Sequence, residues 1–334
     1  MRKGLWVFRS EGRKKVDTTI RIINGNTTYE PVITGEVKLS TERYGSPGKL
    51  TFEVVKDSVI NFQEGNAVQL RVDDADIFLG YVFEKKRSKG ETISVTAYDQ
   101  LRYLKNKDVK QFENMKASEI VKSLAAGFKL KCGEIADTGW VIESLIEDNK
   151  TLFDMIQDAL DETLTNTKVM YVLYDNFGKL TLKNVEGMKL NILMTNETAE
   201  DFDYSTSIDS ETYNQIKLYY DNKDTGLREI YMAKDGSNIN NWGLLQYVEK
   251  ADSNIGISSK ANALLSLYNK KTRKLSLKNA FGDIRVRAGC GIAVSLGLGD
   301  INVNQYFICE AVTHTFKSDM HLMDLTLRGA DFIV

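Results

Sequence analysis

The segment from residue 46 to residue 106 alternates apolar and polar residues in several short runs. Leu50, Phe52 and Val54 fall on one side of a predicted strand, and the residues between them are polar. The same alternation recurs at residues 68–72, 77–83 and 93–97, and the Lys89-Gly90 pair predicts a turn between the last two runs. A period of two indicates strands with one buried face, so this segment predicts a meander or a small antiparallel barrel.

The apolar spacing becomes helical after residue 107. Between residues 117 and 128 apolar side chains recur every three or four positions, which predicts a helix that ends near Gly127. Thr151 and Asp154 have the spacing of a capping box and predict the start of a second helix. Residues 168–174 and 179–183 then predict a hairpin around the turn at 175–178. Together these elements predict a small α/β middle domain.

Strand patterns return after residue 200. We predict strands at residues 214–220, 227–232, 274–277, 292–296, 306–316 and 321–327, with helical spacing between residues 237 and 271. The chain is therefore predicted to be an α+β, β-rich protein with two antiparallel β-barrel domains. The predicted boundaries are 1–107 for the first barrel, 108–190 for the middle domain and 191–334 for the second barrel, with a helical insertion at about 237–272.

Length and charge narrow the classes of function. A chain of 334 residues is long enough for several hydrophobic cores. With 44 basic and 46 acidic residues it has no overall field that would attract a nucleic acid or an anionic membrane. Short basic clusters at residues 13–15, 85–89 and 270–274 lack interleaved aromatic residues, so they indicate at most electrostatic contact with DNA that passes nearby.

Cysteine usage and apolar run lengths predict where the chain folds. Cys132, Cys290 and Cys309 are an odd and widely spaced set, which favours a reducing compartment over a disulfide framework. The first apolar run, residues 5–8, is too short for an export signal, and the longest, residues 169–174, is too short for a membrane helix. We therefore expect a soluble protein made in a cytoplasm, without membrane insertion.

Histidine chemistry is limited by supply, because His314 and His321 are the only two histidines. A tight turn at residues 317–318 would place them opposite each other across a hairpin. A zinc site requires three or four converging protein ligands, and Cys309 does not obviously converge with the pair. A solvated or hydrogen-bonded histidine pair is therefore the preferred interpretation, and we predict no metal and no cofactor.

Phosphate-binding and carboxylate chemistry have weak candidates. The glycines at 289, 291, 297 and 299 flank an apolar strand without a Walker lysine, which favours turn glycines. Asp73, Asp74 and Asp76 lie in a predicted hairpin turn, and Asp158, Asp161 and Glu162 lie on the polar side of the second predicted helix. A peptidoglycan-degrading enzyme remains the alternative hypothesis, with Glu143, Glu147 and Asp154 as the residues to test, but we predict no catalytic residues.

Six stretches of the chain, in order, resemble one protein family. They are SPGKLTFEVVKD, FQEGNAVQLRVDDADIFLGYVFEKKR, ISVTAYDQLRYLKNKD, NKTLFDMIQDALDETLTNTKVMYVLYDNFGKL, GDIRVRAGCGIAV and CEAVTHTFKSDMHLMDLTL. Their sequence is similar to the baseplate hub proteins of contractile-tailed phages and phage-like particles, most closely the PBSX-like type found in prophages of Gram-positive bacteria. YDQLRYLKN is the strongest single piece.

The resemblance implies a structural hub in the baseplate of a virion or a tail-like particle, assembled in the host cytoplasm. In such a hub the two barrels imitate tail-tube subunits, and a homotrimer forms a pseudo-sixfold ring that adapts the sixfold tube to a threefold spike. The implied partners are tail-tube or tube-initiator proteins, a central spike protein, the tape-measure protein and baseplate wedge proteins, with DNA only in transit through the channel. A spike component of a contractile secretion system is a further alternative with the same fold.

Overall fold

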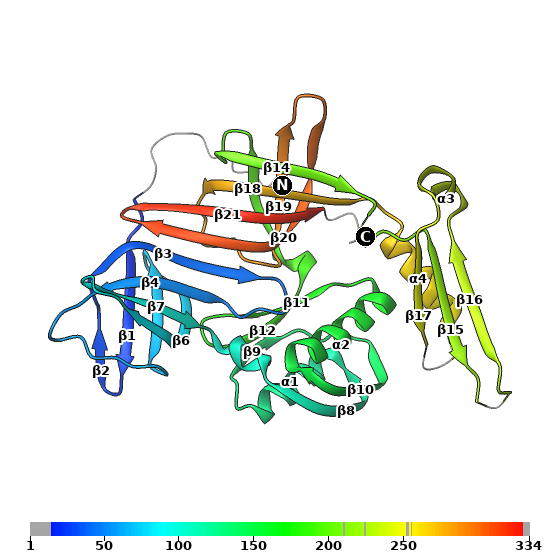
Figure 1. Ribbon diagram of the computed structural model, residues 1–334, viewed down its shortest axis with the longest axis horizontal. Helices are drawn as coiled ribbons and strands as arrows, with labels where there is room; N and C mark the ends of the chain where they lie inside the picture. The colour runs from blue at the N-terminus through cyan, green and yellow to red at the C-terminus, as the bar shows by residue number, and fades with distance from the viewer. Residues whose placement is uncertain (1–14, 210, 224, 252–253, 255, 330–334) are drawn as a thin grey trace, which may run out of the picture.

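A computed structural model describes residues 15–209, 211–223, 225–251, 254 and 256–329. The predicted absence of an export signal, and Arg13 and Lys14 of the first basic cluster, fall in residues 1–14, outside this part of the chain. Within it the chain is β-rich, and one large sheet runs through both barrels (Figure 1), which confirms the α+β prediction. None of the helices described is both long enough and apolar enough to cross a membrane.

The first barrel contains the strands predicted from the alternating segment. They are β1 (Thr18–Asn24), β2 (Thr27–Tyr29), β3 (Ile33–Glu42), β4 (Lys49–Val55), β5 (Ala67–Val72), β6 (Ala75–Arg87) and β7 (Thr92–Tyr98). They pair in the order β3-β4-β7-β6-β5-β1-β2, and the alternate apolar side chains, Leu50 and Phe52 among them, form the core. The aspartate-rich turn between β5 and β6 has an ordinary structural role, because Asp73 Oδ1 accepts a hydrogen bond from the Asp17 N–H.

The middle domain follows a short 3₁₀ turn, η1 (Gln100–Lys105). It contains β8 (Lys107–Lys116), α1 (Ala117–Gly127), β9 (Cys132–Ile135), β10 (Val141–Thr151), α2 (Leu152–Thr167), β11 (Tyr171–Asp175), β12 (Leu180–Asn184) and η2 (Val185–Met188). Both predicted helices and the predicted hairpin are confirmed. The capping box is present, because Thr151 Oγ1 accepts from the Asp154 N–H at 3.1 Å and Asp154 Oδ2 accepts from the Thr151 N–H at 3.2 Å.

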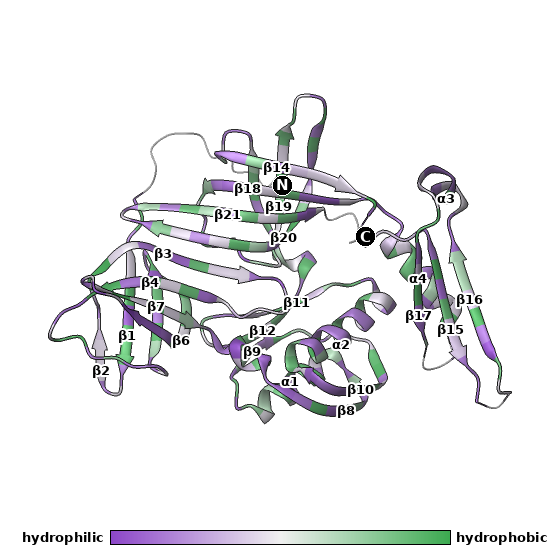
Figure 2. Cartoon of the chain, in the orientation of Figure 1, coloured by the Kyte–Doolittle hydropathy of each residue, from purple (hydrophilic) through white to green (hydrophobic). Residues whose placement is uncertain are grey.

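The second barrel uses the end of the chain. Its strands are β13 (Lys189–Thr195), β14 (Asp201–Ser207), β18 (Thr272–Phe281), β19 (Gly291–Gly297), β20 (Asn302–Lys317) and β21 (Met320–Gly329). They pair in the order β14-β18-β21-β20-β19-β13, with only the β13–β19 pair parallel. Figure 2 shows the alternation of hydrophobic and hydrophilic residues along these strands.

The chain leaves the second barrel after β14 and returns at β18. Between them lie β15 (Gln215–Asp221), β16 (Arg228–Lys234), α3 (Gly236–Trp242), β17 (Gln246–Lys250) and α4 (Ile257–Tyr268). We call this segment the insertion unit. The helical segment predicted at 237–272 also contains the strand β17, and its helix α4 shares a core with β15 through Ile216, Leu218 and Leu264. The unit is larger than the predicted helical segment because α4 packs on the apolar side of β15 and so joins these strands in one core.

Candidate functional site

One strand pair joins the two barrels into a single sheet. β3 of the first barrel pairs antiparallel with β20 of the second, from Glu42 opposite Ala311 to Glu36 opposite Lys317. β20 packs on both cores, because Val312 lies in the core of the second barrel and Phe316 in that of the first. The barrels therefore share backbone hydrogen bonds as well as buried side chains, and this fixes how they lie relative to each other.

The side of this joined sheet that faces away from the cores is polar, and we call it the open face. Polar residues of this face come from six strands of both barrels, among them Lys274, Ser276, Asp324, Thr326, Thr313, Thr315, Glu36, Lys38, Ser40, Lys49, Thr51, Glu53, Ser94 and Thr96. Ser40 and Thr313 meet across the joint, with their hydroxyl oxygens 3.0 Å apart. The described helices lie against other parts of the molecule (Figure 1), so this face is available to a partner or to solvent.

An ion pair fixes one end of the joint. Glu310 forms a bulge in β20, and its carboxylate accepts from Nε of Arg43 at 2.8 Å. The backbone carbonyl of Glu310 also accepts from the Arg43 N–H at 2.8 Å. Both side chains are largely buried, with 10% and 19% of their surface exposed, so the pair is weakly screened by solvent. The guanidinium of Arg43 also lies 3.9 Å from the sulfur of Met170, which extends the contact to the middle domain.

A second polar network joins all three domains. Arg287 of the second barrel donates to the backbone carbonyl of Asp175 at 2.7 Å and lies over the Tyr174 ring of the middle domain. Gln100, just after the first barrel, donates from Nε2 to Asp175 Oδ2 at 2.9 Å. It also accepts at Oε1 from the Lys131 N–H at 3.1 Å. We call Asp99, Gln100, Asp175 and Arg287, together with Tyr174, the joint network.

Within the joint network, Asp99 lies where the chain leaves the first barrel, between β7 and η1. Its carboxylate accepts from the N–H groups of Gly48 and Leu101 at 2.9 and 3.0 Å. Burial raises its pKa well above the usual range for an aspartate, and the nearby charge of Asp175 raises it further. A Cβ atom at Gly48 would lie 2.4 Å from Asp99 Oδ2, so the approach of these two segments requires glycine.

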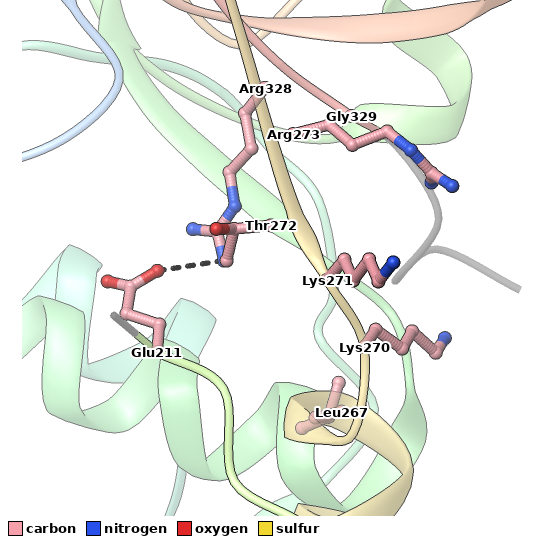
Figure 3. Close-up of a pocket in the computed structure, with 8 residues that line it drawn as sticks. All are labelled: Glu211, Leu267, Lys270, Lys271, Thr272, Arg273, Arg328 and Gly329. Carbon is pink, nitrogen blue, oxygen red and sulfur yellow. Dashed lines mark ion pairs between the residues drawn. The ribbon is translucent and has the colours of Figure 1, made fainter. Parts of the chain in front are cut away.

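A small cavity marks the point where the insertion unit meets the second barrel. Glu211 and Arg328 form an ion pair there at 2.9 Å, and Lys270, Lys271 and Arg273 point to the opposite side of the strand (Figure 3). The cavity has a volume of about 30 Å³, comparable to the share of one water molecule in the liquid. It is therefore too small for an organic substrate.

Comparison with known proteins decides the family. The YQBQ-like family profile matches residues 37–328. The chain belongs to the YQBQ-like family. It is 33% identical to the protein YqbQ of Bacillus subtilis over 90% of this chain and 93% of the relative. It is 30% identical to the phage-like element PBSX protein XkdQ of Bacillus subtilis, over 90% of this chain and 94% of that protein.

A solved structure agrees with the fold of this YQBQ-like protein. The 43 kDa tail protein of prophage MuSo2 from Shewanella oneidensis superimposes with a TM-score of 0.70, over 95% of this chain and 100% of that chain. Its sequence is only 13% identical, so this match concerns the fold. The resemblance to PBSX-like prophage proteins is confirmed, and the fold is similar to that of a solved prophage tail protein.

The two histidines of this YQBQ-like protein meet inside the β20–β21 hairpin. His314 Nδ1 lies 2.8 Å from His321 Nε2, and His314 Nε2 lies 2.9 Å from the Val286 carbonyl. The carbonyl can only accept, so His314 carries its proton on Nε2 and accepts from His321 at Nδ1. His321 is paired in register with Phe316, which makes the two histidines diagonal neighbours. Within the described residues no group of three or more potential metal ligands includes them.

The carboxylates proposed for the enzymatic alternative do not converge. Asp154 caps α2, and Glu143 is exposed on β10. Glu147 is buried beside a β10 bulge and forms an ion pair with Lys150 at 2.8 Å. Burial raises the pKa of Glu147, although Lys150 opposes the shift. Lys150 also contacts Asp158 at 2.6 Å, so this acidic pair is bridged by a lysine and serves to hold α2 on β10.

The polar residues that join the domains were not predicted as a site. Arg43, Arg287 and Glu310 lie far apart in sequence, and no local spacing connects them. The sequence did contain a signal for Asp99 and Gln100, because these two polar residues interrupt an apolar pattern inside the run TAYDQLRYLKN. Both side chains are buried in the structure. A buried polar residue requires a partner, so such an interruption marks a contact between domains.

Proposed function

We propose that this protein is a baseplate hub whose copies form a homotrimeric ring around a channel. The observation that carries the proposal is the continuous sheet through β3 and β20, which gives both barrels one common open face. Three such chains supply six barrels, and their open faces would line the channel. This arrangement would adapt a sixfold tail tube to a threefold spike, and the similarity to the phage-like element PBSX protein XkdQ supports the proposal.

The composition of the open face supports a passage rather than a binding site. Eight of the fourteen polar residues named for it are serine or threonine, and its lysines are accompanied by Glu36, Glu53 and Asp324. Short hydroxyl side chains create no strong electrostatic field and no apolar patch, so the face would bind a passing polymer only weakly. The proposed cargo is the tape-measure protein and, in an infectious particle, DNA in transit.

The edges of the sheet support assembly. β14 is an edge strand, and five of its seven residues are exposed, whereas β2 forms the opposite edge. Exposed edges present unpaired backbone groups that proteins normally cover. A neighbouring copy in a ring, or a tube, spike or wedge protein above and below it, would provide that cover.

The test is a mass measurement in solution. Light scattering of the purified protein, alone and mixed with a central spike protein from the same particle, should give three times the chain mass of 37.7 kDa, with the spike bound in the mixture. Charge reversal on the open face at Lys38 and Lys49 should leave this mass unchanged, because those residues are assigned to the channel. A protein that stays monomeric at all concentrations and ignores the spike would contradict the proposal.

A further inference from the structure

The insertion unit covers only one side of its sheet. α4 packs on β15 and β16 through Ala261 and Leu264, which meet Ile216, Leu218 and Ala233 in a small core. The strands pair in the order β16-β15-β17, so both β16 and β17 have a free edge. The other side of these strands has no cover in the described chain.

That uncovered side carries apolar residues in register. Ile230 and Met232 on β16 are 52% and 61% exposed, and Val248 on β17 is 49% exposed. Ile230 lies opposite Tyr219, and Met232 and Val248 both lie opposite Lys217 on the central strand. An apolar patch of this kind, spread over three strands, is typical of an interaction surface.

The same side is basic. Arg228 and Lys250 both pair with Asp221, at 2.7 and 3.0 Å. Lys217 and Lys234 have no carboxylate partner among the residues described. We call the outer side of β15, β16 and β17 the basic face. A partner for it should be apolar at the centre and acidic around it.

The chain itself contains a surface of that chemistry. β8 and β10 form a two-stranded sheet whose inner side is covered by α1 and α2. On its outer side Val109 and Ile146 are 65% and 70% exposed. Glu113 and Asp148 are exposed on this side without an ion-pair partner in the described part of the chain, beside one exposed lysine, Lys107, whereas Lys110, Lys116 and Lys150 are already paired. We call this outer side the acidic face.

The two faces cannot meet within one chain. α2 covers the inner side of β10 and α4 covers the inner side of β15, and the two helices pack against each other. Lys168, at the end of α2, donates to the Ala263 carbonyl of α4 at 3.1 Å, which holds the helices together. The basic and acidic faces therefore both point away from this helix pair, and in Figure 1 β8 lies below α2 whereas β16 lies to the right of α4.

We propose that the basic face of one copy binds the acidic face of the next copy, head to tail. This contact rests on the proposed ring, and it would connect neighbouring subunits outside the barrels. Two different faces of one chain give a heterologous interface, which closes into a ring when the rotation between copies permits. Apolar contact of Ile230, Met232 and Val248 with Val109 and Ile146 would supply affinity, and the opposed charges would set orientation.

Charge reversal tests the contact. The variant Lys217→Glu/Lys234→Glu should weaken self-association about tenfold in analytical ultracentrifugation, as should Glu113→Lys/Asp148→Lys. The chain with all four substitutions should recover association, because its faces are again opposite in charge. Lys86→Glu/Lys89→Glu, on exposed residues of the first barrel, is the matched control and should have no effect.

Cross-linking separates this contact from the ring itself. In a Cys132→Ser background, Met232→Cys combined with Ile146→Cys should give a ladder up to three chains with a short bismaleimide, and either cysteine alone should give none. If the wild type is a trimer but reversal and cross-linking have no effect, the ring stands and this contact is wrong. If the wild type is a monomer with and without spike, both proposals are wrong.

Discussion

The guanidinium of Arg287 lies 3.7 Å from the centre of the Tyr174 ring and so connects the second barrel to the middle domain. The same guanidinium donates a hydrogen bond to the Asp175 carbonyl, so one side chain contacts two neighbouring residues of β11. A cation over an aromatic ring, combined with a charged hydrogen bond, makes this a strong single contact between domains.

Arg287→Ala should lower the free energy of unfolding by about 2–3 kcal/mol, since a charge-assisted hydrogen bond and a cation–π contact are both lost. Urea unfolding followed by circular dichroism measures the change. Arg21→Ala is the control, because Arg21 forms an exposed ion pair with Glu30 and should cost about 0–1 kcal/mol. Equal effects of the two substitutions would contradict the assigned role of Arg287.

Gly48→Ala should destabilise the exit of the first barrel by about 1–3 kcal/mol, because the new methyl group would overlap the Asp99 carboxylate. Thermal unfolding is the measurement. Gly127 is the matched control, since nothing lies within 4 Å of a Cβ atom there and it ends α1. Gly127→Ala should leave the stability unchanged or raise it slightly. An unchanged stability of Gly48→Ala would contradict the close contact between Gly48 and Asp99.

The histidine pair should make the fold sensitive to mild acid. Burial lowers the pKa of His314 to about 4 and that of His321 to about 3, with the neighbouring His314 lowering the latter further. In the unfolded chain both should titrate near pH 6.5. Stability is therefore full above pH 6.5 and falls as the pH drops toward 4, by up to about 2.7 kcal/mol per pH unit for two protons.

The variant His314→Gln/His321→Gln isolates this effect, because it leaves the titrating carboxylates in place. Its free energy of unfolding should change less than that of the wild type between pH 6.5 and 5. Parallel pH profiles for the two proteins would mean that the pair does not stay neutral in the folded state.

The three thiols should differ in reactivity. Cys132 is exposed, whereas Cys290 and Cys309 are buried in the second barrel. A disulfide-exchange reagent should therefore modify one thiol per native chain and all three after unfolding. Partial burial raises the pKa of Cys132, so its reaction should be slower than that of a free thiol at neutral pH. Rapid modification of Cys309 without unfolding would contradict the described core.

Cell-wall zymograms should show no clearing by the wild-type protein. Glu147→Gln should reduce stability through loss of the Lys150 pair, without changing any lytic readout. Clearing that depends on Glu143, Glu147 or Asp154 would restore the enzymatic alternative.

Local patterns were sufficient for most elements. The period-two segments became strands because their alternate side chains are buried, and Thr151 and Asp154 identified the start of α2. The contacts that join these elements could not be predicted in the same way. The pairing of β3 with β20 involves residues about 270 positions apart, and alternation fixes only which face each strand buries.

The insertion unit shows the same limit. Its helix α4 was anticipated from spacing, but β17 pairs in parallel with β15, which no hairpin signal can reveal. The predicted domain boundaries remain predictions, although each core described above contains residues from the corresponding segment. The joint network escaped prediction because partners such as Asp99 and Arg287 are brought together only by the complete fold.

The long separation of β3 and β20 along the chain has a consequence for synthesis. The first barrel emerges early from the ribosome, but the edge of β3 and the place of Phe316 in its core remain vacant until residues 302–317 are made. An unpaired edge of this kind can recruit the wrong strand while translation continues. Nascent chains truncated before β20 should therefore aggregate or bind chaperones, and the first barrel should become fully protease-resistant only after β20 has been synthesised.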